Sequence, residues 1–218
     1  MEPEAPAKPR LIKYKIFGPK NSGRKSLVFR YTQNAFKQDE VPTFNIDFMV
    51  KMINKNGKKY QLKLFRPKTD EEMGSKEYLK GIKMVIYIFD ITNDDSINHF
   101  KQNAEKLFEN ADKNAFKYVL GNKIDLEEQR KIKEDEAKTL CDKFKYTYKE
   151  ISCKSGKNIN EVFEEIFEQY IKRFPGKKEE PKKVENNIEE DLKDVNPLEG
   201  GEKVEEIKAQ LKNMNMNK

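Results

Sequence analysis

The chain has 218 residues, of which 36% are hydrophobic and 38% are charged, and its formal net charge is +6. This length suits one well-cored domain of about 150 to 180 residues followed by a tail. No apolar run approaches about 18 residues, which argues against a membrane-spanning helix. The start lacks an apolar stretch, which argues against a secretory leader. The only cysteines are Cys141 and Cys153, which argues against a disulfide framework.

Apolar runs rich in β-branched and aromatic residues alternate with longer helical patterns, which predicts an α/β fold with a mainly parallel sheet and helices on both faces. The six expected strands are residues 11–17, 44–54, 59–65, 84–91, 115–121 and 146–152. The five expected helices are residues 25–36, 71–80, 96–110, 134–144 and 159–174. Asn56 and Gly57 join the second and third strands as a tight hairpin, so one edge strand is antiparallel.

The domain is expected to end where Pro175 and Gly176 stop the last helix. We predict an N-terminal extension at 1–9, one domain at 10–175 and a charged tail at 176–218. The tail holds nine Lys and eleven Asp or Glu, which leaves a net charge of +8 on residues 1–175. Within the tail, residues 202–214 have the spacing of a short amphipathic helix that needs a partner to be stable.

A phosphate-binding loop is indicated by the segment KYKIFGPKNSGRKSL, which runs from a strand through two glycines into a helix. Gly18 and Gly23 have the GxxxxG spacing of such a loop. Glycines let backbone amides approach a phosphate, and the helix that follows presents free N–H groups at its positive end. We therefore assign Gly18, Ser22 and Gly23 to a nucleotide cradle.

Two registers are open for the residues after these glycines. In the preferred register, Arg24 and Lys25 occupy the positions where the pattern has a lysine and a magnesium-binding Ser or Thr. The other register takes Lys25 and Ser26 as that pair, but it puts Pro19 and Arg24 where glycines are needed. Arg24, Lys25 and Ser26 are all candidate nucleotide-binding residues.

Two further segments follow predicted strands, as the cradle does. The sequence GNKIDL at residues 121–126 follows one predicted strand, and Ser152, Cys153 and Lys154 follow another. With the cradle, these segments make residues 10–174 resemble the Rab branch of the Ras superfamily of small GTPases. The resemblance implies a small G domain with the P-loop NTPase fold and a bound GTP or GDP.

The resemblance also assigns roles in guanine recognition. It implies that Asp125 accepts hydrogen bonds from N1 and the exocyclic amine of guanine, which favours guanine over adenine. It implies that Asn122 and Lys123 brace the loops and that the backbone around Cys153 meets O6 of the base. These residues all match the family pattern.

The first switch of the family resembles residues 42–48, PTFNIDF. Thr43 stands at the position that contacts magnesium and the outer phosphate, so we include it among the candidate binding residues. A β-branched residue also suits the start of a strand, and both explanations of Thr43 stay open.

The second switch departs from the family, because this chain has FRPKTDE where a Rab has WDTAGQE. Arg66 replaces the aspartate that holds magnesium, Thr69 the glycine that senses the third phosphate, and Asp70 the glutamine that positions water. Lys25 and Arg66 bring the local charge to about +2, where a Ras-type site with its metal has about +1. We hypothesise that these two cations stand in for magnesium, and we assign no catalytic or metal-ligating residue.

These changes favour a pseudo-GTPase, an interaction or scaffold module that binds guanine nucleotide with little or no hydrolysis. One alternative is a divergent GTPase switch that is slow or needs a partner, and another is a nucleotide-free component of a large cytoskeletal or ciliary assembly. We expect a cytoplasmic protein with protein partners that order the 176–218 tail. We expect no nucleic acid partner and no lipid anchor, because the last residues contain no cysteine and Glu2 excludes myristoylation.

Overall fold

The computed structural model describes residues 8–36, 48–66 and 75–175. The chain divides into two units, Met1–Pro175 and Gly176–Lys218. Parts of several predicted segments lie outside the described residues: residues 1–7 of the extension predicted at 1–9, residues 42–47 of the first switch, residues 67–71 of the second switch, and the tail with its expected helix at 202–214.

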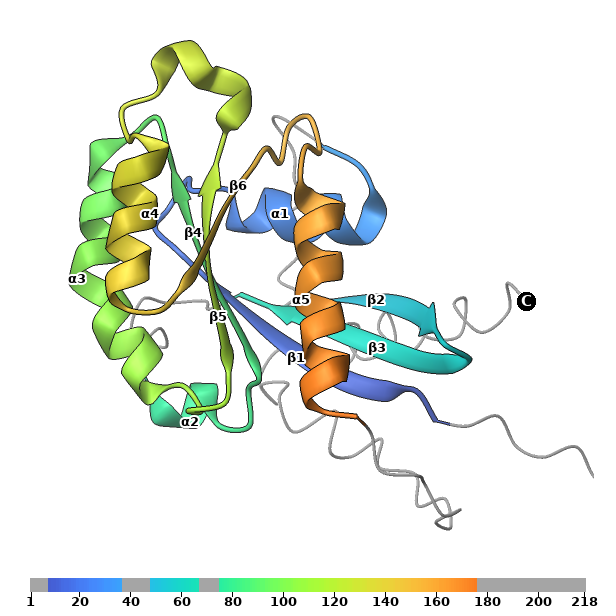
Figure 1. Ribbon diagram of the computed structural model, residues 1–218. Coiled ribbons are helices and arrows are strands. Elements are labelled where there is room, and N and C mark those ends of the chain that lie inside the picture. The colour runs from blue at the N-terminus through green and yellow to red at the C-terminus, as the bar shows by residue number, and fades with distance from the viewer. Residues whose placement is uncertain (1–7, 37–47, 67–74, 176–218) are drawn as a thin grey trace, which may run out of the picture. The chain divides into compact units, whose positions relative to one another are not determined.

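Six strands of the described residues form one sheet in the order β2-β3-β1-β4-β5-β6 (Figure 1). Every neighbouring pair is parallel except β2 and β3, which confirms the predicted fold class. The strands are β1 (Arg10–Phe17), β2 (Phe48–Lys55), β3 (Lys58–Phe65), β4 (Met84–Asp90), β5 (Phe116–Asn122) and β6 (Thr147–Ile151).

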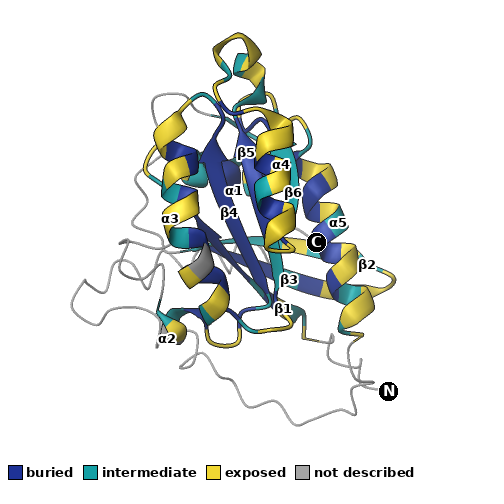
Figure 2. Cartoon of the chain, turned by 60° about the vertical axis from the view of Figure 1, so that its left-hand side comes forward, coloured by how far each residue is buried: buried dark blue, intermediate teal, exposed yellow. Residues whose placement is uncertain are grey.

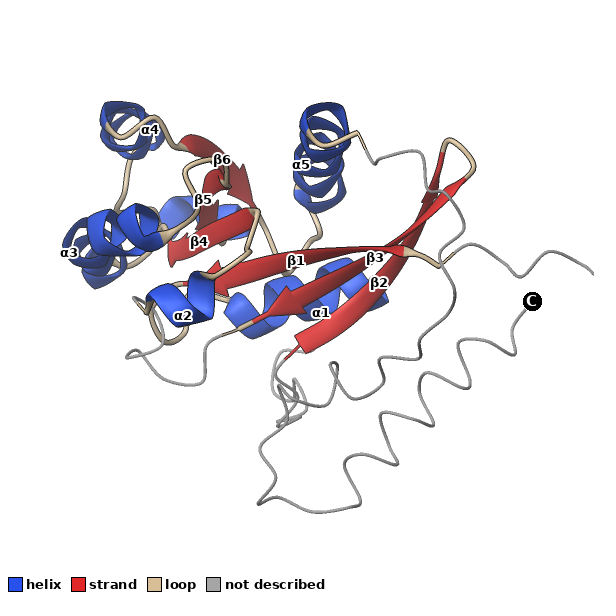
Figure 3. Ribbon diagram, turned by 90° about the horizontal axis from the view of Figure 1, so that it is seen from below, coloured by secondary structure: helices blue, strands red, loops and turns tan. Residues whose placement is uncertain are grey.

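Helices cover both faces of this sheet, and Figure 3 shows α3 and α4 on the side opposite to α5. Their apolar residues separate into two cores, one that joins α1 and α5 to the sheet and one that joins α2, α3 and α4 to it. The helices are α1 (Arg24–Gln33), α2 (Lys76–Leu79), α3 (Asp94–Asn110), α4 (Glu134–Lys143) and α5 (Ile159–Arg173). None of the described helices is long and apolar enough to cross a membrane.

The central strand is β4, whose seven residues are all buried (Figure 2). A strand with both faces covered needs apolar side chains on both alternations, which explains the run MVIYIF. The hairpin between β2 and β3 turns through Asn56 at φ 52° and Gly57 at φ 70°, and Lys55 pairs with Lys58. Left-handed residues at both positions make the tight turn that matches strand twist, as predicted.

The predicted ends of most elements are within two residues of those observed. The strand predicted at 44–54 and the helix predicted at 71–80 are observed as β2 (Phe48–Lys55) and α2 (Lys76–Leu79), and residues 44–47 and 71–74 lie outside the described residues. Helix α1 was predicted to reach residue 36. It ends at Gln33, because Asn34 takes a left-handed conformation and donates its N–H to the carbonyl of Arg30. A 3₁₀ helix at Ile124–Gln129 was not predicted. It follows Lys123, which is also left-handed at φ 75°, and such single-residue conformations carry little sequence signal outside glycine.

The side chain of His99 on α3 is only partly exposed, and its Nδ1 lies 2.5 Å from the hydroxyl of Tyr87. Tyr87 is fully buried on β4 and needs a polar partner for its hydroxyl.

Tyr14 on β1 provides a stability test, because its hydroxyl is buried and has no hydrogen-bond partner among the described residues. Replacing Tyr14 with Phe should leave the free energy of unfolding unchanged or raise it by about 1 kcal/mol, since an unpaired buried hydroxyl is unfavourable. The matched control is Tyr118→Phe, which removes a hydroxyl that donates to Glu165 at 3.2 Å. Urea unfolding should show a loss for the control, and an equal loss for Tyr14→Phe would contradict the interpretation.

Candidate guanine-nucleotide site

The phosphate loop connects the end of β1 to the start of α1 and passes close to two neighbouring strands. Gly18 has φ +144°, and a Cβ there would lie 2.1 Å from the carbonyl oxygen of Ile88 on β4. Gly23 has φ +102°, and its Cβ would lie 2.2 Å from Nδ2 of Asn122. Both positions therefore require glycine, which agrees with the register in which Gly18 and Gly23 frame the loop.

Helix α1 begins at Arg24, directly after Gly23 as its N-cap, and has no acidic residue in its first turn. The N–H groups of a first helical turn have no partner within the helix and lie at its positive end. Lys25 is exposed and Ser26 is partly exposed in this turn. Within the loop, the Ser22 hydroxyl donates to the carbonyl of Pro19 at 2.8 Å. This end of the helix can bind an anion such as phosphate.

Asn122 joins the phosphate loop to both predicted guanine loops. Its amide donates to the carbonyl of Ser22 at 2.9 Å, and its carbonyl accepts from the N–H of Cys153 at 3.0 Å. The side chain is 2% exposed. The residues predicted from three distant parts of the sequence are thus brought together at the carboxyl edge of the sheet, where parallel α/β sheets bind ligands.

Asp125 lies beside this junction in the 3₁₀ helix and is exposed. Its Oδ1 accepts a hydrogen bond from Oγ of Ser152 at 2.5 Å, and the same hydroxyl oxygen accepts from the N–H of Ser155 at 3.0 Å. The carboxylate is therefore oriented from one side. A carboxylate can accept several hydrogen bonds, so Asp125 can also receive the two N–H groups that guanine presents.

Cys153 is 3% exposed, and its thiol points toward the carbonyl of Gly23 at 4.0 Å. Burial raises the pKa of this thiol to about 12, so it stays protonated at neutral pH and has a packing role. Arg30 of α1 supports the same loop, because its Nε donates to the carbonyl of Cys153 at 3.0 Å and its terminal nitrogen donates to that of Lys154. Lys154 itself is exposed.

Sequence reasoning missed Arg30 and also missed Asp90, the last residue of β4. The side chain of Lys123 forms an ion pair with Asp90, with 2.5 Å between Nζ and Oδ2. Neither Arg30 nor Asp90 lies in a segment that sequence spacing marks as a loop motif, so only the folded chain shows that they belong to the site.

Two cationic residues, Lys25 and Arg66, stand at the positions where the family pattern has magnesium ligands. Arg66 directly follows β3, which pairs with β1 through Lys15 and Phe65, so Arg66 and the phosphate loop lie at the same edge of the sheet. Magnesium takes oxygen ligands, and the ammonium of Lys25 and the guanidinium of Arg66 cannot provide them. Thr43, Thr69 and Asp70 lie outside the described residues.

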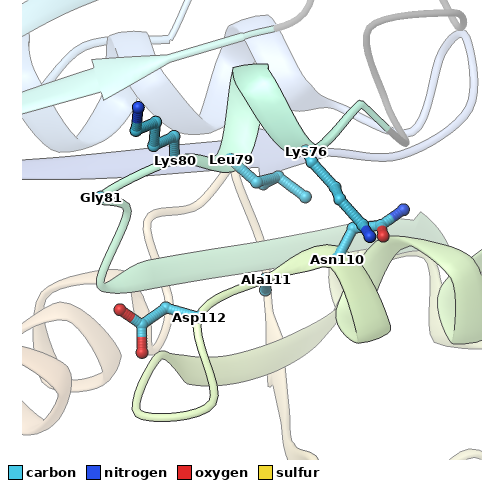
Figure 4. A pocket seen from close by; sticks show the side chains of 7 residues that line it. All are labelled: Lys76, Leu79, Lys80, Gly81, Asn110, Ala111 and Asp112. Atoms are coloured by element: carbon cyan, nitrogen blue, oxygen red, sulfur yellow. The ribbon is translucent and has the colours of Figure 1, made fainter.

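A cavity of about 400 Å³ lies elsewhere, at the amino edge of the parallel strands (Figure 4). It is lined by residues of α2, the turn after it, the last residue of α3 and the two residues after that helix, and these include Lys76, Lys80 and Asp112. The carboxylate of Asp112 is already paired with Lys83. Because the phosphate loop lies at the carboxyl edge, this cavity is separate from the nucleotide site.

Comparison with known proteins agrees with this geometry. Residues 13–172 match the family model for the Ras family. The chain is 28% identical over 155 residues to human Ras-related protein Rab-8B, covering 70% of this chain and 75% of that protein. It is 26% identical over 176 residues to Ras-related protein Rab-13 of dog, covering 80% and 87%. It is 24% identical over 181 residues to GTP-binding protein ypt2 of Schizosaccharomyces pombe, covering 82% and 90%. The chain therefore belongs to the Ras family and is a Rab-like member of these small GTP-binding proteins.

Proposed function

We propose that this chain is an interaction module that binds guanine nucleotide with little or no hydrolysis of GTP. The observation that carries the proposal is the junction at Asn122, whose side chain bonds to Ser22 and Cys153 and so holds the phosphate loop against the guanine loops. Asp125, oriented by Ser152, supplies the carboxylate for the base. The partners of such a module would be proteins, and its place would be the cytoplasm.

The expected loss of hydrolysis is supported by the sequence of the second switch. Catalysis of phosphoryl transfer depends on positioning the water and stabilising charge. Thr69 and Asp70 replace the glycine and glutamine that do this in the family, and Arg66 replaces the aspartate that holds the metal. Binding depends on other groups, namely the amides of the phosphate loop and the carboxylate of Asp125, so it can persist when hydrolysis is lost.

The nucleotide content of the purified chain tests the proposal directly. The protein is denatured, and the released small molecules are separated by chromatography and identified by ultraviolet absorbance. GDP or GTP is the expected result, and an empty protein that also fails to bind added GDP would overturn the proposal. Single-turnover hydrolysis of GTP then separates the module from a slow GTPase, because the module should leave GTP intact over hours.

Magnesium dependence tests the second part of the proposal, namely that Lys25 and Arg66 take the place of the metal that the family normally uses. We expect nucleotide release from the wild type to differ by less than about twofold between magnesium and chelator, because on this proposal two cations of the chain balance the phosphate charge that the metal would otherwise balance. The double variant Lys25→Ser with Arg66→Asp restores oxygen ligands. Its release should become more than about tenfold slower in magnesium than in chelator.

A stopped-flow measurement with a fluorescent GDP analogue gives these rates. Lys58→Ser is a suitable control for loss of one exposed lysine, since Lys58 starts β3 at the opposite end from the site. Strong magnesium dependence in the wild type would show that the metal is bound despite the two cations.

A further inference from the structure

A buried carboxylate lies beside the guanine loop and has no role in the function proposed above. Asp90 ends β4, is 6% exposed, and pairs in the strand register with Asn122 at the end of β5. Its backbone is therefore fixed next to the residue that joins the three loops. A buried carboxylate is unfavourable unless hydrogen bonds or a cation compensate for the lost hydration.

The contacts of Asp90 fall into two groups. On its own side of the site, Oδ1 accepts from the N–H of Thr92 at 2.9 Å and from its hydroxyl at 2.7 Å. The backbone N–H of Asp90 donates to Oγ of Ser96 at 2.9 Å. These bonds hold the carboxylate in place without any help from the guanine loop. On the other side, Oδ2 lies 2.5 Å from Nζ of Lys123.

The two members of this ion pair differ in how firmly they are held. Asp90 has a short side chain fixed by Thr92, whereas the long side chain of Lys123 can adopt many rotamers when it is unpaired. Lys123 also has a left-handed backbone, φ 75°, immediately before the 3₁₀ helix that carries Asp125. The position of Asp90 therefore determines the position of Lys123, and the side-chain entropy of Lys123 is lost before any ligand binds.

We propose that Asp90 is a positioning residue of the nucleotide site, which fixes Lys123 and thereby lengthens the residence time of the bound guanine nucleotide. This inference rests on the proposed function, because it needs a nucleotide to bind. A site organised in advance loses less entropy on binding, so its complex dissociates more slowly. Asp90 itself acts through Lys123 and the guanine loop.

The test measures release of a fluorescent GDP analogue from the full chain carrying Asp90→Asn, Lys123→Met or both changes. Asparagine keeps an oxygen that accepts from Thr92 but loses the charge that holds Lys123. Each single variant should release the analogue roughly tenfold faster than the wild type, because a hydrogen bond between charged groups is lost. The double variant should release it no faster than the faster single variant, since both changes remove one interaction.

Two controls separate positioning from a general effect on the fold. Asp94→Asn makes the same chemical change at an exposed residue in the first turn of α3 and should leave release unchanged. Thr92→Val removes a hydrogen bond from the other oxygen of Asp90 and keeps the ion pair. It should lower the thermal unfolding temperature and speed release by less than Asp90→Asn does, because the backbone N–H of residue 92 still donates to Oδ1 of Asp90.

Three results would overturn the inference. Unchanged release from Asp90→Asn, with faster release from Lys123→Met, would mean that Lys123 is positioned without Asp90. Equal acceleration by Thr92→Val and Asp90→Asn would give Asp90 a purely structural role. A wild type that binds no GDP would overturn both this assignment and the proposed function, which distinguishes that failure from the first two.

Discussion

Replacing Asn122 with alanine should lower the free energy of unfolding by about 3 kcal/mol and reduce guanine-nucleotide binding by about 100-fold or more. The side chain is 2% exposed and makes one hydrogen bond to the phosphate loop and one to the loop at Cys153. Alanine would leave a buried carbonyl at Ser22 and a buried N–H at Cys153 without partners. It would also open a cavity between loops that must move together to hold a ligand.

Urea unfolding of the nucleotide-free proteins measures the first effect, and titration with a fluorescent GDP analogue measures the second. Asn98→Ala is the matched control, because Asn98 is exposed on α3 and its removal should change neither quantity. A stability loss below about 1 kcal/mol for Asn122→Ala would mean that the three loops hold together without this side chain.

The fold was predictable where one local pattern determines the structure. The run from Met84 to Phe89 is apolar on both alternations and could only be a strand covered on both faces. Asn56 and Gly57 determine the antiparallel pairing of β2 and β3 because both tolerate a left-handed backbone. The end of α1 depends instead on the left-handed conformation of Asn34, for which the sequence offers many equally suitable positions.

The candidate site was predictable to the extent that its residues lie in short continuous motifs. Asn122 and Asp125 are separated by two residues, and their chemistry can be recognised from the sequence. The residues that support them come from distant parts of the chain. Arg30 is 123 residues from Cys153, and Asp90 is 33 residues from Lys123. Their importance follows from strand order and helix packing, which no local pattern contains.

Charge illustrates the same limit. The sequence shows an excess of positive residues around the phosphate loop, with Lys25 in place of a neutral hydroxyl and Arg66 in place of an aspartate. It does not show that Asp90, at the end of β4, places one negative charge beside Lys123 of the guanine loop. The contact between Asp90 and Lys123 offsets one positive charge at the guanine end of the site, and only the folded chain shows it.

Replacing Asp125 with asparagine should reduce GDP affinity by roughly 1,000-fold while leaving the thermal unfolding temperature nearly unchanged. Asp125 is exposed, and its hydrogen bond from Ser152 can be kept by the amide oxygen of asparagine. What the variant loses is a group that accepts both N–H bonds of guanine. The asparagine side chain has one carbonyl acceptor and one NH₂ donor. Xanthine presents the matching N1–H donor and C2 carbonyl acceptor, so the affinity for xanthosine diphosphate should rise.

Competition of GDP and of xanthosine diphosphate against the same fluorescent analogue measures both affinities. Glu128→Gln is the control, because it makes the same carboxylate-to-amide change at an exposed residue of the 3₁₀ helix. Unchanged GDP affinity in Asp125→Asn would mean that this loop does not read the base. Because Asn122→Ala should weaken both folding and binding, whereas Asp125→Asn should weaken binding alone, the two variants separate the residue that assembles the site from the residue that recognises guanine.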